Sequence, residues 1–225
     1  MRMKRMRATL ATIVIAAAGG AMASAQTNAP TAAQASNEAR EARSQTDVGL
    51  SIYEAFTSST SGNGTTQTPS NSPGGMFEVR HIVKPLLGFE VTYSFNPAAQ
   101  SYVSTPSNCG FLCASQPVKN SANASEVSVD YVASKTFGNL RPFAVGGMGF
   151  FITVPAASNT DYLNTIVRMA YVYGGGVDWA FSPHLGLRIQ YRGNVYKAPN
   201  LSPYFNPTGV FTQSAEPMGG VFYSF

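Results

Sequence analysis

The chain has 225 residues and a formal net charge of +4, yet only 12% of its residues are charged and 21 are glycine. After the first 25 residues no apolar run approaches 18 residues, so the rest of the sequence excludes a transmembrane helix. The roughly 200 residues that remain are enough for one large or two small domains.

Residues 1–25 have the pattern of a secretory signal peptide. Four basic residues lie within Met1–Arg7, an apolar stretch follows to about Ala18, and Ala23-Ser24-Ala25 is an A-x-A cleavage pattern. The alternative, an anchor helix that is never cleaved, does not account for the A-x-A pattern. We expect cleavage before Gln26, and we interpret residues 26–45, which are rich in Ala, Gln, Asn and Ser, as a periplasmic linker.

Loss of the signal peptide removes the net charge. The segment contains four of the 15 Lys and Arg residues and none of the 11 Asp and Glu residues, so the mature chain is neutral. The basic pI therefore gives no reason to expect a nucleic acid partner.

From Thr46 onward apolar and polar residues alternate, which is typical of strands with one apolar face. The alternation predicts eight strands, at about 46–56, 76–83, 87–95, 125–134, 140–152, 166–181, 184–195 and 215–225. The outward face of most of them is rich in Tyr, Phe, Val and Leu. In the fifth strand we assign Phe143, Val145 and Phe151 to that face, and in the first strand Glu54 breaks the pattern.

The connections alternate between short and long. Those after the second, fourth and sixth strands are short, around Lys84-Pro85, 135–139 and Ser182-Pro183. The other connections are long, at about 57–75, 96–124, 153–165 and 196–214. Short periplasmic turns and longer extracellular loops are typical of transmembrane barrels. We therefore predict an all-β fold, an eight-stranded antiparallel up-and-down transmembrane β-barrel over residues 46–225.

The alternate positions of these strands place charged side chains inside the barrel. An eight-stranded barrel is just wide enough for side chains to fill it, and buried charges must be paired. The predicted interior ion-pair network has four acidic and four basic members: Glu78, Arg80, Glu90, Asp130, Arg168, Asp178, Arg188 and Arg192. The alternative is that these residues face solvent on the strands of a soluble protein.

Two further patterns concern cysteine and glycine. Cys109 and Cys113 lie close together in an exported chain, so we predict a disulfide in preference to a metal site, for which neither His is near in sequence. The glycine runs at 146–149 and 174–176 lack the spacing of a phosphate-binding loop. We interpret them as room for curvature and for bulky interior side chains.

The segments Arg141–Gly147 and Gly174–Tyr191 resemble OmpA-like barrels. The second segment resembles the last hairpin of that family. Its first strand is Gly-rich and holds the inward Asp178, the turn is at Ser182-Pro183, and its second strand holds the inward Arg188. The terminal Phe225 resembles the signal that the barrel assembly machinery reads. The resemblance implies a small outer-membrane barrel, similar to the OmpX and OmpW-like groups, without a C-terminal peptidoglycan-binding domain.

Three functions remain open for such a barrel. A lipid A enzyme needs a nucleophile and a base near the outer leaflet, but His81 and His184 are predicted at the periplasmic end. A pore needs an aqueous channel, which eight strands do not leave. We favour a structural or surface-interaction role through the extracellular loops, whose aromatic residues after the seventh strand (Tyr196, Tyr204, Phe205 and Phe211) suit either a binding platform or an interface girdle.

The predicted location is the bacterial outer membrane, with both termini in the periplasm. The expected partners are outer-membrane lipids, lipopolysaccharide and, during insertion, the barrel assembly machinery. We expect a monomer without catalytic residues, cofactor, metal or nucleic acid.

Overall fold

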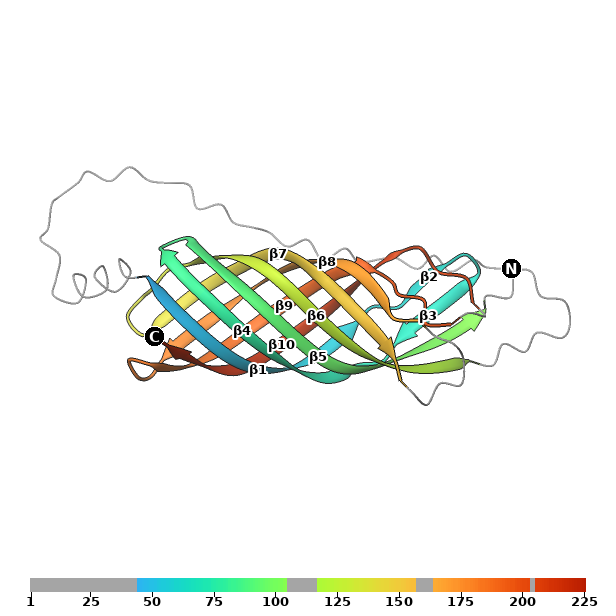
Figure 1. Cartoon of the computed structure of the whole chain (residues 1–225), viewed down its shortest axis with the longest axis horizontal. Helices are drawn as coiled ribbons and strands as arrows, with labels where there is room; N and C mark the ends of the chain where they lie inside the picture. Colours follow the sequence, from blue (N-terminus) through green and yellow to red (C-terminus); the bar gives the residue numbers. More distant parts are fainter. Residues whose placement is uncertain (1–43, 105–116, 157–163, 203–204) are drawn as a thin grey trace, which may run out of the picture.

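The computed structural model describes residues 44–104, 117–156, 164–202 and 205–225, and its regular structure is all-β. Eight long strands close into a barrel, as predicted (Figure 1). Their bounds are β1 Gln45–Thr57, β4 Ser72–Lys84, β5 Leu87–Ser104, β6 Val118–Ser134, β7 Leu140–Pro155, β8 Ile166–Ala180, β9 Leu185–Lys197 and β10 Phe211–Ser224. Among these residues no helix is long and apolar enough to cross a membrane.

Each barrel strand pairs antiparallel with its neighbours in the chain, and the first and last strands close the ring. The β1–β10 pairing runs in register from Asp47 opposite Ser224 to Thr57 opposite Ser214. The order around the barrel is therefore β1, β4, β5, β6, β7, β8, β9, β10 and back to β1. Every barrel strand has two hydrogen-bonded neighbours, so the barrel has no open edge.

A short hairpin lies in the first long connection, where the sequence predicted only a loop. Strands β2 (Thr60–Gly62) and β3 (Thr65–Pro69) flank Asn63 and Gly64, which both have positive φ. Two such residues between paired strands form the tight turn that Asn-Gly favours. Strand β3 then pairs with the far end of β5, so the hairpin extends the barrel wall.

The two ends of the barrel differ. The connections β4–β5, β6–β7 and β8–β9 are short and lie at the same end as Phe225; we call this the short-turn end. The hairpin β2–β3 and the β9–β10 connection lie at the opposite, long-loop end (Figure 1). The strands extend further toward this end than predicted, to Ser104 in β5 and back to Val118 in β6. The prediction ended them early because the outward residues there are no longer large and apolar, so the alternation that marks a strand is lost.

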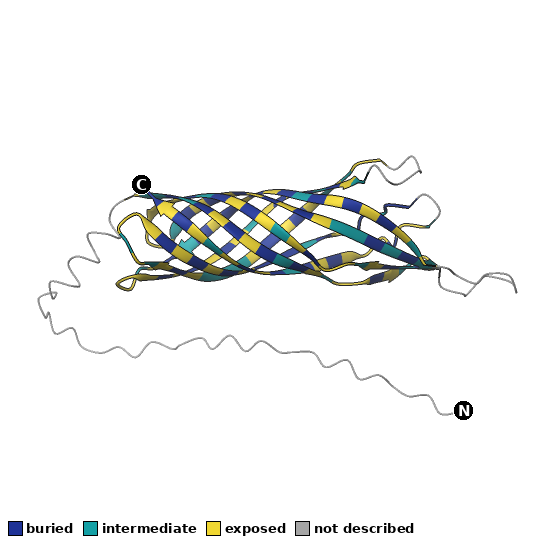
Figure 2. Cartoon of the chain, turned by 90° about the horizontal axis from the view of Figure 1, so that it is seen from below, coloured by how far each residue is buried: buried dark blue, intermediate teal, exposed yellow. Residues whose placement is uncertain are grey.

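Buried and exposed residues alternate along every barrel strand (Figure 2). The outward face exposes large apolar side chains, including Ile52 at 76%, Ile189 at 74% and Val129 at 56%. A water-soluble protein rarely exposes a contiguous apolar surface of this extent. Lipid is the solvent that such a surface fits. Glu54 lies on the outward face, where the alternation placed it, and is half-buried.

The fifth predicted strand has the opposite phase to the one predicted. In β7 the side chains of Phe143, Val145 and Phe151 are buried, whereas Met148 and Phe150 are 55% and 59% exposed. The outward positions 144 and 146 hold Ala and Gly, whereas the large apolar residues 143, 145 and 151 point inward. The alternation of hydrophobicity therefore indicated the wrong face as the outward one. The interior aromatic ring of Phe143 contacts arginine side chains, as described below.

The outward face predicts a depth-dependent cost of charge. Val129 lies between Val91 and Met148 on the neighbouring strands, and all three face outward. Val129→Arg should lower the free energy of unfolding by about 2–4 kcal/mol, because arginine would sit in the middle of the apolar band.

The matched control is Phe137→Arg in the short-turn end, where Phe137 is 57% exposed and the cost should be about 0–1 kcal/mol. Urea unfolding in lipid vesicles measures both variants. Equal costs at the two positions would contradict a membrane around the middle of the barrel.

Candidate functional site

The structure buries seven of the eight charged residues that the sequence placed inside the barrel. The exception is Arg168, which points toward the interior side of β8 but is only half-buried and forms no ion pair with a described residue. Four further interior charges were not predicted: Asp47, Glu126, Arg141 and Glu216. The buried interior therefore holds seven carboxylates and four guanidinium groups in the described residues, rather than equal numbers.

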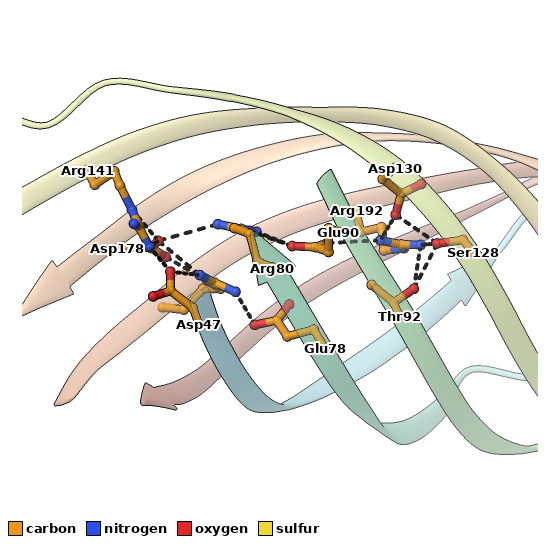
Figure 3. A network of polar contacts seen from close by, with 11 residues as sticks. Asp47, Glu78, Arg80, Glu90, Thr92, Ser128, Asp130, Arg141, Asp178 and Arg192 are labelled. Atoms are coloured by element: carbon orange, nitrogen blue, oxygen red, sulfur yellow. Dashed lines mark hydrogen bonds and ion pairs between the residues drawn. The ribbon is translucent and has the colours of Figure 1, made fainter. Parts of the chain in front are cut away.

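Asp178 is the centre of the part of this interior network that lies nearer the short-turn end, on the left of Figure 3. Its Oδ1 accepts from Arg188 Nε at 2.6 Å, and its Oδ2 accepts from Arg141 Nη2 at 2.8 Å. Arg80 Nη1 lies 3.4 Å from the same oxygen. One carboxylate thus faces three guanidinium groups, and the carboxylates of Asp47 and Glu78 pair with the outer sides of Arg141 and Arg188.

Arg192 is the centre of the other part of the network, on the right of Figure 3. It donates to Glu126 Oε1 at 2.9 Å and to Asp130 Oδ2 at 3.0 Å, and its Nη2 also reaches Ser128 Oγ at 2.6 Å. Glu90 joins the two halves, since it accepts from Arg80 Nε at 2.6 Å and lies 3.8 Å from Arg192 Nη1. The ion pairs therefore form one connected chain along the inside of the barrel (Figure 3).

Aromatic rings fill the space beside the guanidinium groups. Arg80 lies 4.0 Å from the centre of the Phe143 ring, and Arg188 lies 5.2 Å from that of Phe222. Glycines make room for both rings: a Cβ at Gly176 would lie 2.8 Å from Phe143, and one at Gly186 would lie 2.2 Å from Phe222. This supports the interpretation that strand glycines accommodate bulky interior side chains. The inverted phase of β7 is what places Phe143 next to arginine, where a cation–π contact is favourable.

Two cavities at the ends of the described interior are small. At the short-turn end a cavity of about 20 Å³ is lined by Arg141, Asp178 and Phe222. Toward the long-loop end another cavity of about 20 Å³ is lined by Glu216 and Tyr196, among others. Each has room for about one water molecule, and the ion-pair network lies between them.

The β9–β10 connection crosses the opening at the long-loop end. Residues Ala198–Ser202, which we call the closing segment, are almost all buried, with Leu201 only 1% exposed. Leu201 packs against Tyr102 of β5 and Ala122 of β6. Strands β5 and β6 lie opposite β9 and β10 in the strand order, so the segment reaches across the barrel.

Hydrogen bonds hold the closing segment to three different strands. Gln67 Nε2 of β3 donates to the Pro199 carbonyl at 2.8 Å, and Asn120 Nδ2 of β6 donates to the Leu201 carbonyl at 2.7 Å. The Leu201 amide donates to the Tyr102 hydroxyl of β5 at 2.7 Å. Buried backbone groups are thus satisfied, as a stable closure requires.

The aromatic residues of this region have different surroundings. Tyr196 is buried and stacks on Phe151 at 4.2 Å between ring centres, while Phe205 stacks on Tyr102 at 5.6 Å. Only Phe211, at 59% exposed, has the outward position of a girdle residue. Tyr204 lies outside the described residues, as do Cys109 and Cys113, the signal peptide and the linker as far as residue 43. The disulfide therefore stays a prediction.

Both histidines lie at the short-turn end. His81, near the end of β4, contacts the hydroxyls of Thr46 at 2.9 Å and Ser44 at 3.3 Å. His184 contacts the Ser224 carbonyl at 2.9 Å and stacks on Tyr223. In the described part of the chain no three His, Cys, Asp or Glu side chains are grouped as a metal site would need.

The network predicts a large effect of neutralising its central carboxylate. Asp178→Asn should lower the free energy of unfolding by about 3–5 kcal/mol, because three buried guanidinium groups lose a shared counter-ion. Urea titration of the barrel folded in neutral detergent, followed by the gel mobility of unheated samples, measures this change.

The control is Glu54→Gln, which removes a half-buried outward carboxylate with no ion pair to a described residue and should change stability by no more than about 0.5 kcal/mol. Similar costs for Asp178 and Glu54 would refute the role assigned to the network.

Comparison with solved structures places this geometry among small outer-membrane barrels. The fold is similar to Neisserial surface protein A, with 14% identity, a TM-score of 0.53 and coverage of 80% of this chain and 97% of that chain. It is also similar to OprG from Pseudomonas aeruginosa, with 11% identity, a TM-score of 0.55 and coverage of 82% and 97%. A third is Ail, the attachment invasion locus protein of Yersinia pestis, in complex with the heparin analogue sucrose octasulfate: 10% identity, a TM-score of 0.50 and coverage of 81% and 99%.

No protein-family model and no curated protein matches the sequence. At these identities the likeness shows the fold alone. The chain has the closed eight-stranded antiparallel barrel of small bacterial outer-membrane proteins.

Proposed function

We propose that this protein resides in the bacterial outer membrane and acts through its long-loop end. The apolar outward face and the shared fold of outer-membrane barrels support the location. The short-turn end, which carries both barrel termini, faces the periplasm in this proposal, and the long-loop end faces the cell exterior. Lipopolysaccharide then surrounds a monomeric barrel, and the barrel assembly machinery reads Phe225 during insertion.

The closing segment is the observation that carries this proposal. It covers the opening with buried, hydrogen-bonded backbone, and the β2–β3 hairpin raises one side of the wall beside it. Asn63 Nδ2 of that hairpin donates to the Pro207 carbonyl at 2.7 Å, so the two long connections are joined. A folded surface of this kind suits binding of a partner, because its groups are already ordered before contact.

The interior does not favour transport. The ion-pair network and the aromatic rings fill the middle of the barrel, and the cavities beyond them each hold about one water molecule. Nor does the geometry favour catalysis at the outer leaflet, since His81 and His184 both lie at the other end. We therefore propose a non-catalytic role.

The charge of the long-loop end favours an anionic ligand. Lys119 and Lys197 are exposed there, and Arg168 lies half-buried nearby on β8. Of the described acidic residues toward that end, Glu126 and Glu216 are buried and Glu54 is half-buried, so the fully exposed charges there are the two lysines. The heparin analogue in the Ail complex is a ligand of this class on a barrel of the same fold.

Purified protein in planar bilayers tests the sealed interior. We expect no steady single-channel current, because the network blocks the path between the two small cavities. Shortening residues 198–210 to a tight turn should leave the barrel folded and still without current, since the network is deeper than the closing segment. A large, steady current from the wild-type protein would replace this proposal with a pore.

Binding of the protein, held in nanodiscs of zwitterionic lipid, to immobilised heparin tests whether the long-loop end binds an anionic ligand. Lys119→Gln combined with Lys197→Gln should weaken binding about 5- to 10-fold at low salt, and the difference should shrink at high salt. The matched control combines Lys84→Gln with Lys135→Gln, two exposed lysines at the short-turn end. No binding by the wild type, or equal losses in both pairs, would refute an anionic ligand at the long-loop end.

A further inference from the structure

Glu216 differs from the other buried carboxylates of the barrel. Of the seven in the described interior, it alone has no arginine within ion-pair distance. Its Oε1 accepts from Asn194 Nδ2 at 3.0 Å and from Ser214 Oγ at 3.1 Å, and both donors are neutral. A carboxylate that is 4% exposed is costly to keep ionised with neutral donors alone.

The nearest candidate counter-ion is committed elsewhere. Arg192 is the residue directly opposite Glu216 in the β9–β10 pairing. Its guanidinium nevertheless crosses the interior to Glu126 and Asp130 on β6, where it is held by Ser128 as well. The described interior has three more carboxylates than guanidinium groups, so Arg192 cannot leave β6 without exposing other acidic groups to the same deficit.

A small cavity of mixed polar and apolar lining lies next to Glu216. It has a volume of about 20 Å³, and Ser214, Asn96, Gln100 and Thr153 are among the polar residues that line it. Thr153 is only 1% exposed, and its Oγ1 has no hydrogen-bond partner in the described part of the protein. A buried hydroxyl without a partner beside an uncompensated carboxylate indicates that a further group belongs between them.

We propose that this cavity binds one alkali-metal cation, with the Glu216 carboxylate and the Thr153 hydroxyl among its ligands. Oxygen ligands suit hard cations, and a single carboxylate matches the charge of a monovalent ion rather than a divalent one. The cavity has the size of one water molecule, which fits Na⁺ or K⁺ but excludes larger organic cations. The cation supplies the positive charge that Arg192 withholds from Glu216.

The cation site ties the network to the long-loop end. The cavity is also lined by Pro69 and Ser70, which end the β2–β3 hairpin region, and by Tyr196 at the end of β9. A bound cation therefore holds the base of the extracellular structure to the barrel interior. This inference is independent of the anionic ligand proposed above, because it concerns a site beneath the surface.

Thermal unfolding in neutral detergent tests the site with the cations themselves. NaCl or KCl at ten times the dissociation constant should raise Tm by about 3 to 6 °C relative to choline chloride at the same ionic strength. Glu216→Gln keeps the shape and one acceptor oxygen, and it should abolish the difference. Thr153→Val should reduce the difference while leaving Glu216 charged, and Glu54→Gln, on the outward face, should leave it unchanged.

Crystals soaked in a thallium(I) salt give a direct reading. An anomalous peak beside Glu216 in the wild type, absent in Glu216→Gln, is the expected result. Should Glu216→Gln fail to fold, Thr153→Val with a weaker peak carries the same test. Equal Tm in sodium, potassium and choline would overturn the proposal, as would a peak elsewhere or stabilisation by Ca²⁺ alone. Stabilisation at low pH without any cation effect would show that a proton neutralises Glu216, and it would overturn the proposal too.

Discussion

The confined width of an eight-stranded barrel governs most of this structure. The interior has room for side chains and little else, so an inward charge cannot be solvated and needs a charged or hydrogen-bonding neighbour. Asp178 meets that need for three arginines at once, and Glu90 connects their group to Arg192. Such ion pairs need not add stability over an apolar filling, but once present each makes the loss of its partner costly.

The filled interior leaves the two ends of the barrel as the surfaces open to other molecules. A barrel wall whose outward face meets lipid and whose inside is packed offers few free groups along its middle. The long-loop end is different, because its strands continue past the apolar band. Its first and last connections are joined through Gln67 and Asn63, and Asn120 of β6 holds the last one. The short-turn end has tight connections with little surface of their own. Sequence variation that changes binding is therefore expected in the long connections, while the strands keep their alternation.

The sequence predicted the barrel because period-2 alternation is a direct consequence of strands with one face in lipid. Seven strands had the predicted phase. The prediction was wrong for the remaining strand, β7. There Ala144 and Gly146 occupy outward positions while Phe143 and Phe151 pack inside, so hydrophobicity does not indicate which face meets lipid. The alternation alone could have added Asp47, Glu126 and Glu216, which occupy inward positions of their predicted strands. The β2–β3 hairpin also had a local signal, since Asn63-Gly64 is the dipeptide that a two-residue turn favours.

What the sequence could not supply is the choice of partner. Parity places Glu216 and Arg192 on the same face and opposite one another, so a pair between them is the natural expectation from register. The guanidinium instead reaches two carboxylates and one hydroxyl of β6 and the Thr92 hydroxyl of β5, which together offer it more acceptors than Glu216 does. That choice depends on which strand lies across a closed barrel, a relation set by the shear and not by any local motif. The carboxylate left without an arginine is the one that borders the cavity beneath the long-loop end.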